Sequence, residues 1–237
     1  MNFAAPLIPA VLERRYQRFL ADARLDDGSV VCAHIPNSGA MTGLKEPGMR
    51  IWLSRSDNPK RKLAYTWELA EVEGSLVGVN TAHPNAIVAE AIAEGRVPEL
   101  AGYAAIKREV RYGENSRIDI LLTHPERPRC LVEIKNVHLR RAEIGDGCVA
   151  EFPDAVTERG AKHLREMSAA VATGDRAVML YLVQRTDCAS FSLARDIDPG
   201  YAEAFALARA AGVEALAYTC AISTIGLTLD RPLPLAV

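Results

Sequence analysis

Hydrophobic and polar positions alternate in two neighbouring stretches near the middle of the chain, and this alternation predicts two strands joined by a turn. Successive side chains of a strand point to opposite faces. Asp119 interrupts the apolar run of residues 118–122, on the face opposite its two isoleucines. Glu133 and Lys135 share one face of residues 130–135. A buried carboxylate costs free energy unless it is paired, hydrogen-bonded or bound to a metal. Two carboxylates and an amine at neighbouring strand ends therefore favour a divalent cation beside a lysine.

Before residue 80, short apolar runs separated by turn signals predict a small β-barrel. Residues 11–20 fit either an amphipathic helix or a long bent strand. The strand interpretation is favoured because the turn signal Asp26-Asp27-Gly28 follows and leads into another strand-like run. The strand-like runs cover residues 11–20, 29–35, 49–53, 62–69 and 75–79. Five strands without a convincing helix are typical of a small barrel. The loop of residues 37–43 lacks the Gly-Lys-Ser/Thr of a P-loop, and could be a tight loop near a site or a plain connection.

After residue 80, helical and strand-like segments follow one another. Proline and asparagine at 84–85 and glycine at 95 bound a short helix, and Pro153 and Asp154 predict the start of another. Residues 176–185 form a nearly continuous apolar run, which predicts a strand buried on both faces. A helix at 201–212, a strand at 214–222 and a tail from 230 complete the chain. This order predicts an α+β protein, in which residues 1–80 form the barrel and residues 81–237 form an α/β domain with a mixed central sheet.

Composition narrows the function classes. The chain has 237 residues, of which 49% are hydrophobic and 24% charged, as in ordinary globular proteins. Its net charge of −2 is not that of a strongly basic nucleic-acid binder, so binding to nucleic acid would need a local positive patch. No apolar run is long enough to span a membrane and the N-terminus does not resemble a signal peptide, so we expect a cytoplasmic protein. The five cysteines show no zinc-ligand spacing and are expected to be reduced thiols.

Longer motifs carry a resemblance to a known family. Asp119 followed by Glu133-Ile134-Lys135 resembles the core of the PD-(D/E)XK nucleases, with Ile118 at the place of the signature's proline. The chain is similar over nearly its whole length to the sugar fermentation stimulation protein family. The motifs that carry this similarity are Asn37-Ser-Gly, Pro84-Asn85, Glu90-Ala-Ile, Ser116-Arg-Ile-Asp, Val132-Glu-Ile-Lys-Asn-Val, the stretch 152–164 and Leu182-Val-Gln-Arg. The resemblance implies a five-stranded OB-like barrel followed by a nuclease-like domain, and a DNA-binding protein.

The resemblance also implies a set of site residues. Asp119, Glu133 and the carbonyl of Ile134 would hold Mg²⁺ or Mn²⁺, with Lys135 beside them. The family pattern places Glu90, on the first helix, and Gln184, at the end of the buried strand, near this metal. Glu109 could reach the site or pair with a basic neighbour, and the sequence leaves both open.

Cations interleaved with aromatic residues in the barrel suit the binding of a nucleic-acid backbone together with base stacking. The competing interpretation is that the aromatics fill the barrel and the cations are solvated. The cations and histidine expected to touch nucleic acid are Arg15, Arg18, Lys60, Arg61, Lys62, Arg159, Lys162 and His163. The last three accompany the helix predicted after Pro153.

Two functions follow from these observations. The first is a DNA-binding protein with a Mg²⁺-dependent phosphodiesterase site. The alternative is a non-catalytic DNA-binding regulator of sugar metabolism genes that keeps the nuclease fold. A metabolic hydrolase is disfavoured because no G-x-S-x-G, H-E-x-x-H or dinucleotide loop is present.

Overall fold

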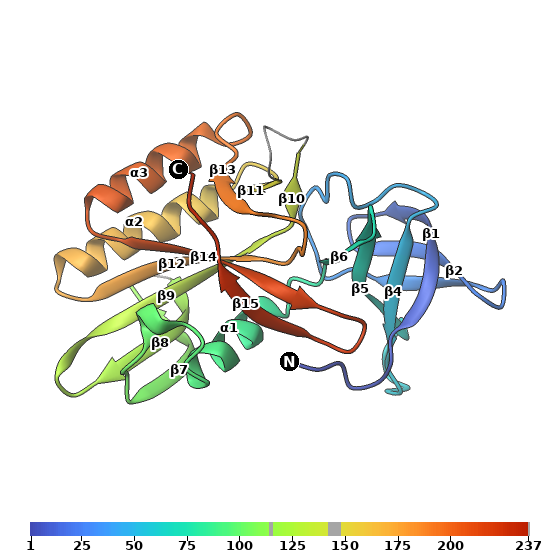
Figure 1. Ribbon diagram of the computed structural model, residues 1–237, viewed down its shortest axis with the longest axis horizontal. Coiled ribbons are helices and arrows are strands. Elements are labelled where there is room, and N and C mark those ends of the chain that lie inside the picture. The colour runs from blue at the N-terminus through green and yellow to red at the C-terminus, as the bar shows by residue number, and fades with distance from the viewer. Residues whose placement is uncertain (114–115, 142–147, 237) are drawn as a thin grey trace.

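The computed structural model describes residues 1–113, 116–141 and 148–236. A small barrel lies at one end of the molecule, and a larger sheet with helices on both faces lies at the other (Figure 1). Both expected parts of the fold are therefore present.

The barrel is built from the first strands of the chain. They are β1 (Ile8–Tyr16), β2 (Leu20–Leu25), β3 (Val30–His34), β4 (Arg50–Arg55), β5 (Tyr65–Val72) and β6 (Ser75–Gly78). The strand order is β3-β2-β1-β4-β5-β6, and a parallel pairing of β3 with β5 closes five strands into a ring. The strand interpretation of residues 11–20 is confirmed, but the strand breaks at Gln17 and Arg18, whose φ angles are 46° and 66°. Alternate side chains, among them Leu12 and Trp67, fill the barrel.

The second part centres on a six-stranded mixed sheet in the order β15-β14-β12-β9-β8-β7. Its strands are β7 (Ala105–Tyr112), β8 (Ser116–His124), β9 (Arg127–Val137), β12 (Arg176–Val183), β14 (Glu214–Ile222) and β15 (Leu227–Pro232). A small sheet contains β10 (Leu139–Arg140), β11 (Val149–Phe152) and β13 (Ser190–Leu193). The helices are α1 (Pro84–Ala93), α2 (Glu158–Ala172) and α3 (Pro199–Ala210), with a 3₁₀ turn at Pro98–Leu100.

Helices cover both faces of the large sheet (Figure 1). Alternate residues of β12 explain why this strand is almost wholly apolar. Val178 and Leu180 pack in the core that includes α1, whereas Met179 and Tyr181 pack in the core that includes α2 and α3. Each face of β12 is therefore buried under a different layer.

Two expected boundaries in this part were wrong. The helix predicted from Pro153 begins at Glu158, because Thr157 accepts a hydrogen bond from Gly160 N and caps it. The expected tail instead continues as β15, which pairs with β14 in antiparallel orientation. Both errors concern contacts, the Thr157 cap and the pairing of β15 with β14, that the local sequence pattern did not indicate.

The barrel and the second part share a core. Leu69 of β5 packs in the same cluster as Ile87 of α1 and Leu229 of β15. The first residues of the chain also lie against the second part, since Phe3 N donates to Ile225 O at 2.9 Å. Packing across the junction therefore fixes how the barrel is placed beside the sheet.

The five cysteines are unpaired, as expected for reduced thiols; Cys130, Cys188 and Cys220 are buried and the other two half-buried. None of the helices in the described ranges is long and apolar enough to cross a bilayer.

Candidate metal and nucleic-acid site

The site forms where β8 and β9 part. The antiparallel pairing of the two strands stops at the pair Ile120 and Val132. Beyond it, the Asp119 side chain takes the place of a backbone partner, because Asp119 Oδ2 accepts a hydrogen bond from Ile134 N at 2.7 Å. The interrupted ladder thus fixes Asp119 against the segment that carries Glu133 and Lys135.

Glu133 is the buried centre of the cluster, with 3% of its surface exposed. Its Oε1 accepts hydrogen bonds from Lys135 Nζ at 2.7 Å and from His163 Nδ1. Burial acts to raise the pKa of Glu133, but the His163 hydrogen bond and the Lys135 charge outweigh it and lower that pKa. Glu133 Oε2 is also buried, and it has no partner among the described residues. One oxygen of an ionised carboxylate is therefore held by two donors while the other remains available.

His163, on α2, is oriented from its other side. Arg159 Nε donates to His163 Nε2 at 3.3 Å, so Nε2 is an acceptor and the hydrogen-bond network assigns the ring proton to Nδ1. The ring is 4% exposed. His163, expected as a nucleic-acid contact, thus makes its described contacts inside the cluster, where it holds Glu133.

The surroundings of Asp119 disfavour its ionised form, whereas those of Glu133 favour it. Burial, and next the charge of Glu133, raise the pKa of Asp119 above its ordinary value. Asn85 Nδ2 donates to Asp119 Oδ1 at 2.8 Å and to Glu109 Oε1 at 3.0 Å. Glu109 therefore reaches the edge of the site through Asn85. Its φ of 54° lies in the left-handed region, which is unusual for a residue other than glycine inside a strand.

A hollow of about 310 Å³ opens over these residues. The first residues of two helices border it, Pro84 and Asn85 from α1 and Arg159 and Gly160 from α2. The helix dipole and the backbone N–H groups of Asn85 and Arg159 make such ends favourable for anions such as phosphate, whereas Pro84 has no N–H and Gly160 N already donates to Thr157 Oγ1. The hollow thus combines acidic oxygens on its floor with anion-binding groups at its rim.

Two carboxylates and a backbone carbonyl are what the site offers a hard divalent cation, since no group of three or more His, Cys, Asp or Glu side chains in the described ranges is placed to hold one. Carboxylate oxygens are its preferred ligands, and Glu133 Oε2 is a buried carboxylate oxygen without a partner. A cation between Asp119 and Glu133 would also relieve the repulsion that raises the pKa of Asp119. Ile134, the third expected ligand, lines the same hollow.

Glu90 is not brought to this cluster. Its carboxylate pairs with the N-terminal ammonium of Met1, with Oε2 at 2.8 Å. The reason lies in helix geometry, because Glu90 lies five positions after Asn85 and each step along the helix turns it by about 100°. The two side chains consequently point about 140° apart, and Asn85 is the α1 residue that faces Asp119.

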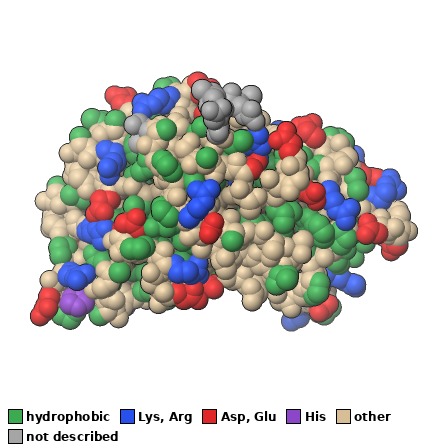
Figure 2. Space-filling model, viewed as in Figure 1, with side chains coloured by type: hydrophobic (Ala, Val, Ile, Leu, Met, Phe, Trp, Pro, Cys, Tyr) green, Lys and Arg blue, Asp and Glu red, His purple; other side chains and the backbone are tan. Residues whose placement is uncertain are grey.

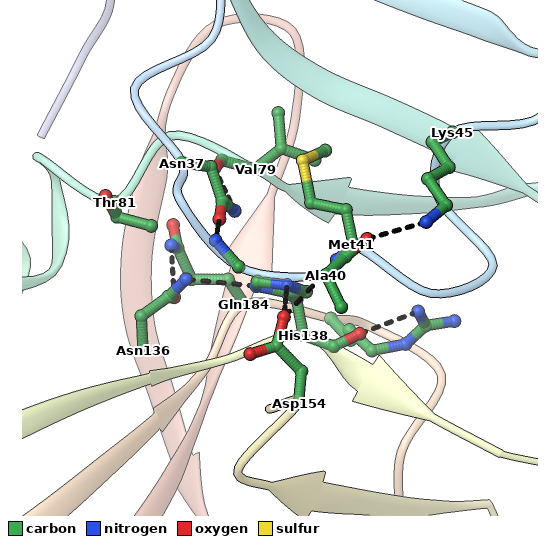
Figure 3. Close-up of polar contacts among 12 residues, drawn as sticks. Asn37, Ala40, Met41, Lys45, Val79, Thr81, Asn136, His138, Asp154 and Gln184 are labelled. Atoms are coloured by element: carbon green, nitrogen blue, oxygen red, sulfur yellow. Dashed lines mark hydrogen bonds and ion pairs between the residues drawn. The ribbon is translucent and has the colours of Figure 1, made fainter. Parts of the chain in front are cut away.

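Gln184 lies one residue away from the cluster rather than in it. It is fully buried, and its Nε2 donates to Asn136 Oδ1 at 2.6 Å (Figure 3). Asn136 follows Lys135 and lines the hollow. Gln184 therefore meets the site through Asn136.

From Asn136 a polar chain crosses to the barrel (Figure 3). Asn136 Nδ2 donates to His138 Nδ1 at 3.1 Å, and His138 Nε2 lies 3.3 Å from Asp154 Oδ2. The same Asp154 oxygen accepts from Met41 N, in the barrel loop, at 3.3 Å. Burial acts to raise the pKa of Asp154, but the His138 ring and the backbone N–H groups of Met41 and Ala40 outweigh it and lower that pKa. The loop of residues 37–43 is thus docked onto the strand end that carries the site.

The expected barrel cations are not part of the hollow. Arg15 donates to the backbone oxygens of Arg18, Asn37 and Gly39, so it holds the loop that meets Asp154. The second group, Lys60, Arg61 and Lys62, is exposed in the connection between β4 and β5, where Arg61 donates to Thr66 Oγ1 at 3.0 Å.

The helix cations lie closer to the site. Arg159 is exposed at the rim of the hollow, and Lys162 is exposed one turn along, 3.6 Å from Glu166. Acidic and basic side chains are interspersed over the face seen in Figure 2, in keeping with the net charge of −2. Contact with nucleic acid on that face would therefore be local.

Sequence reasoning missed the roles of Asn85, Asn136, His138 and Asp154. Asn85 carried a signal, because it stands in the Pro84-Asn85 motif, but it was interpreted only as a helix start. The other three contribute to contacts between segments that are distant in sequence, which no local pattern indicates.

Comparison with known proteins places the chain in a family. The family model described as "Sugar fermentation stimulation protein RE domain" matches residues 82–226, and the model described as "SfsA N-terminal OB domain" matches residues 14–79. A sugar fermentation stimulation protein homolog of Paramagnetospirillum magneticum is 60% identical over 98% of this chain and 97% of its own. One from Rhodospirillum centenum is 59% identical over the full length of both.

A solved structure agrees with the whole architecture. The structure of Pyrococcus furiosus SfsA in complex with Ca²⁺ is 27% identical, covers 100% of this chain and 98% of its own, and superposes with a TM-score of 0.88. With two family models covering most of its length and relatives near 60% identity, the chain belongs to the sugar fermentation stimulation protein family.

Proposed function

We propose that this protein hydrolyses phosphodiester bonds of DNA with the help of Mg²⁺ or Mn²⁺. The observation that carries the proposal is the convergence of Asp119, Glu133 and Lys135 at one hollow, with a buried Glu133 oxygen left without a partner. The Ca²⁺ held by the related Pyrococcus furiosus protein supports a divalent cation in this fold.

The cation would be held by Asp119, Glu133 and the Ile134 carbonyl. When bound, it supplies Lewis-acid polarisation of the phosphate and favours deprotonation of an attacking water. In the reaction, the water oxygen bonds to phosphorus, one ester P–O bond breaks, and the leaving oxygen takes up a proton.

The chain's own groups have separate tasks in this reaction. The Lys135 ammonium, held 2.7 Å from Glu133, is placed to donate to a phosphoryl oxygen as negative charge builds on it. His163 keeps Glu133 oriented, and Asn85 keeps Asp119 oriented. These positioning contacts matter because small displacements of a reacting group slow a reaction strongly.

The rim of the hollow suits the DNA backbone. The N-terminal ends of α1 and α2, together with Arg159, offer backbone N–H groups and a guanidinium to phosphate. The barrel cations Lys60, Arg61 and Lys62 would add contacts further along the strand. Such binding should weaken steeply with salt, since each neutralised phosphate releases counterions.

Cleavage assays test the proposal. Single- and double-stranded DNA and RNA are incubated with Mg²⁺ or Mn²⁺ and the wild type, Asp119→Asn, Lys135→Ala or Lys107→Ala. Lys107 is an exposed lysine of β7 outside the hollow and serves as the matched control. We expect metal-dependent cleavage by the wild type and Lys107→Ala, lost in the other two. Binding without cleavage by all four proteins would instead support the non-catalytic DNA-binding regulator.

A further inference from the structure

A second cavity, larger than the hollow over the carboxylates, lies between β7, β9 and α2. Its volume is about 540 Å³, within the range of small-molecule sites. Leu131, in its wall, precedes Glu133 by two residues on the same face of β9. Glu166, in the opposite wall, follows His163 by three residues on α2 and therefore lies on the same side of that helix. The cavity, here called the β9–α2 pocket, thus lies on the same faces of β9 and α2 as the hollow over Asp119 and Glu133.

The floor of the β9–α2 pocket is suited to a flat apolar group. Leu131 is buried, and the side chains of Ala169 and Ala170 beside it are single methyl groups. The half-buried ring of Tyr112 forms the wall towards β7. Small side chains beside an aromatic ring leave room for a planar ring to stack.

The rim of the pocket is cationic. Arg111 and Arg165 are exposed, and the side chain of neither has a hydrogen bond or an ion pair with any residue in the described ranges. Arg129 also lines the pocket but is held by Asp175 through two hydrogen bonds of 2.9 and 2.7 Å. Two guanidinium groups without a partner among the described residues, above an apolar floor, fit a ligand that joins a flat ring to a phosphate.

Tyr112 links the pocket to the catalytic carboxylates. Burial, followed by the charges of Glu133, Glu166 and Asp119, raises the pKa of Tyr112. Its hydroxyl is buried and has no partner in the described part of the chain. A ring stacked on Tyr112 would therefore lie next to the site at which a phosphodiester is cut.

We propose that the β9–α2 pocket binds one nucleotide unit of the substrate strand, with its base against Tyr112 and Leu131 and its phosphate at Arg111 and Arg165. The inference deepens the proposed phosphodiesterase function and rests on it, since the unit bound here adjoins the bond that is cut. Binding of this unit would make the base beside the cleaved bond a determinant of the cleavage position.

Binding of mononucleotides tests the pocket without cleavage. The affinities of the four deoxynucleoside 5′-monophosphates and of deoxyribose 5-phosphate are measured by calorimetry, without added metal. The proteins are the wild type, Ala169→Trp, which fills the pocket, and Ala172→Trp, the same change at an exposed alanine of α2 outside the pocket. A third variant carries Arg111→Ala and Arg165→Ala together.

Base stacking predicts that at least one mononucleotide binds the wild type roughly 5- to 150-fold more tightly than the sugar phosphate does. Ala169→Trp should lose this preference and Ala172→Trp should keep it. The double arginine variant should weaken binding of both ligands by a similar factor. Equal affinity of the wild type for nucleotide and sugar phosphate, or an unchanged preference in Ala169→Trp, would overturn the pocket.

This outcome is separable from that of the proposed function. A protein that cuts nucleic acid but shows no base-dependent binding keeps the hydrolytic site and loses the pocket. A protein that binds mononucleotides in the wild type and not in Ala169→Trp, yet cuts nothing, keeps the pocket and loses the hydrolytic function.

Discussion

Replacing Asp119 with asparagine should stabilise the protein in the absence of metal and abolish its response to divalent cations. Burial and the charge of Glu133 raise the pKa of Asp119 in the folded chain, so folding disfavours its ionised form. Asparagine removes the charge and keeps an oxygen to accept from Ile134 N, and its new amide can donate to Asn85 once the Asn85 amide turns to present its oxygen. The carboxylate that the proposed function needs therefore destabilises the folded protein when no metal is bound.

The size of the effect follows from linkage. Each unit by which the folded pKa exceeds the unfolded one costs about 1.4 kcal/mol at a pH above both values. For a chain of this length, 1 kcal/mol changes the melting temperature by about 2–4 °C. The variant should therefore melt about 3–6 °C higher for each tenfold rise in the proton affinity of Asp119 on folding.

The sign of the pH dependence is fixed by the direction of the shift. Between the unfolded and folded pKa values of Asp119, the folded chain binds more protons, so its stability falls as pH rises. The advantage of Asp119→Asn should be absent below the unfolded pKa of about 4 and fully present above the raised folded value. Asp154→Asn is the matched control with the opposite sign, because the pKa of Asp154 is lowered and its ionised form stabilises the fold.

Thermal unfolding in a chelating buffer across this pH range measures both effects. Mn²⁺ is then added at 100 times its dissociation constant, which should stabilise the wild type by about 2.7 kcal/mol and leave Asp119→Asn unchanged. A lower melting temperature for Asp119→Asn than for the wild type at pH 8 without metal would refute the reasoning, as would a full response of the variant to Mn²⁺.

Three further changes test contacts around the site. His163→Leu removes a donor from the buried Glu133 carboxylate, so the free energy of unfolding in urea should fall by about 1–3 kcal/mol. Gly78→Ala would place a Cβ 2.6 Å from Gln184 Oε1. We expect it to lower the melting temperature, because a strand and a fully buried side chain must shift. Glu90→Gln should leave the Mn²⁺-induced rise in melting temperature unchanged, since its partner is the N-terminal ammonium.

Each of these expectations has a contrary result. An unfolding free energy within error of the wild type in His163→Leu would mean that the histidine does not hold the carboxylate. An unchanged melting temperature in Gly78→Ala would mean that the junction is loosely packed; the control is Gly200→Ala, where the added Cβ would meet Asp198 Oδ1 at an ordinary contact distance of 3.4 Å. Loss of the Mn²⁺ response in Glu90→Gln would restore this residue to the metal site.

The central cluster could be predicted because its geometry is local. Strand alternation alone places Glu133 and Lys135 on one face, and the apolar run around Asp119 marks it as a costly buried acid. The barrel was predictable for the same reason, since turn signals at regular intervals delimit its strands. Local periodicity was therefore enough to predict the fold class and the faces on which Asp119, Glu133 and Lys135 lie.

The remaining parts depend on contacts between distant segments. Asp154 accepts from Met41 N across 113 residues of sequence, and nothing near either residue signals the other. The same limitation explains the misplaced helix start. Asp154 has the residue type of a helix cap, but its carboxylate instead accepts a hydrogen bond from the barrel loop. The family pattern names the helix that carries Glu90, whereas packing sets the rotation of that helix and places Glu90 beside the Met1 ammonium.

The most direct measurement is the anomalous scattering of Mn²⁺ in crystals of the wild-type protein. The account predicts one strong peak in the hollow, within bonding distance of oxygens of Asp119 and Glu133 and of the Ile134 carbonyl. No peak there at saturating Mn²⁺, with Lys135 and His163 still on Glu133, would contradict it.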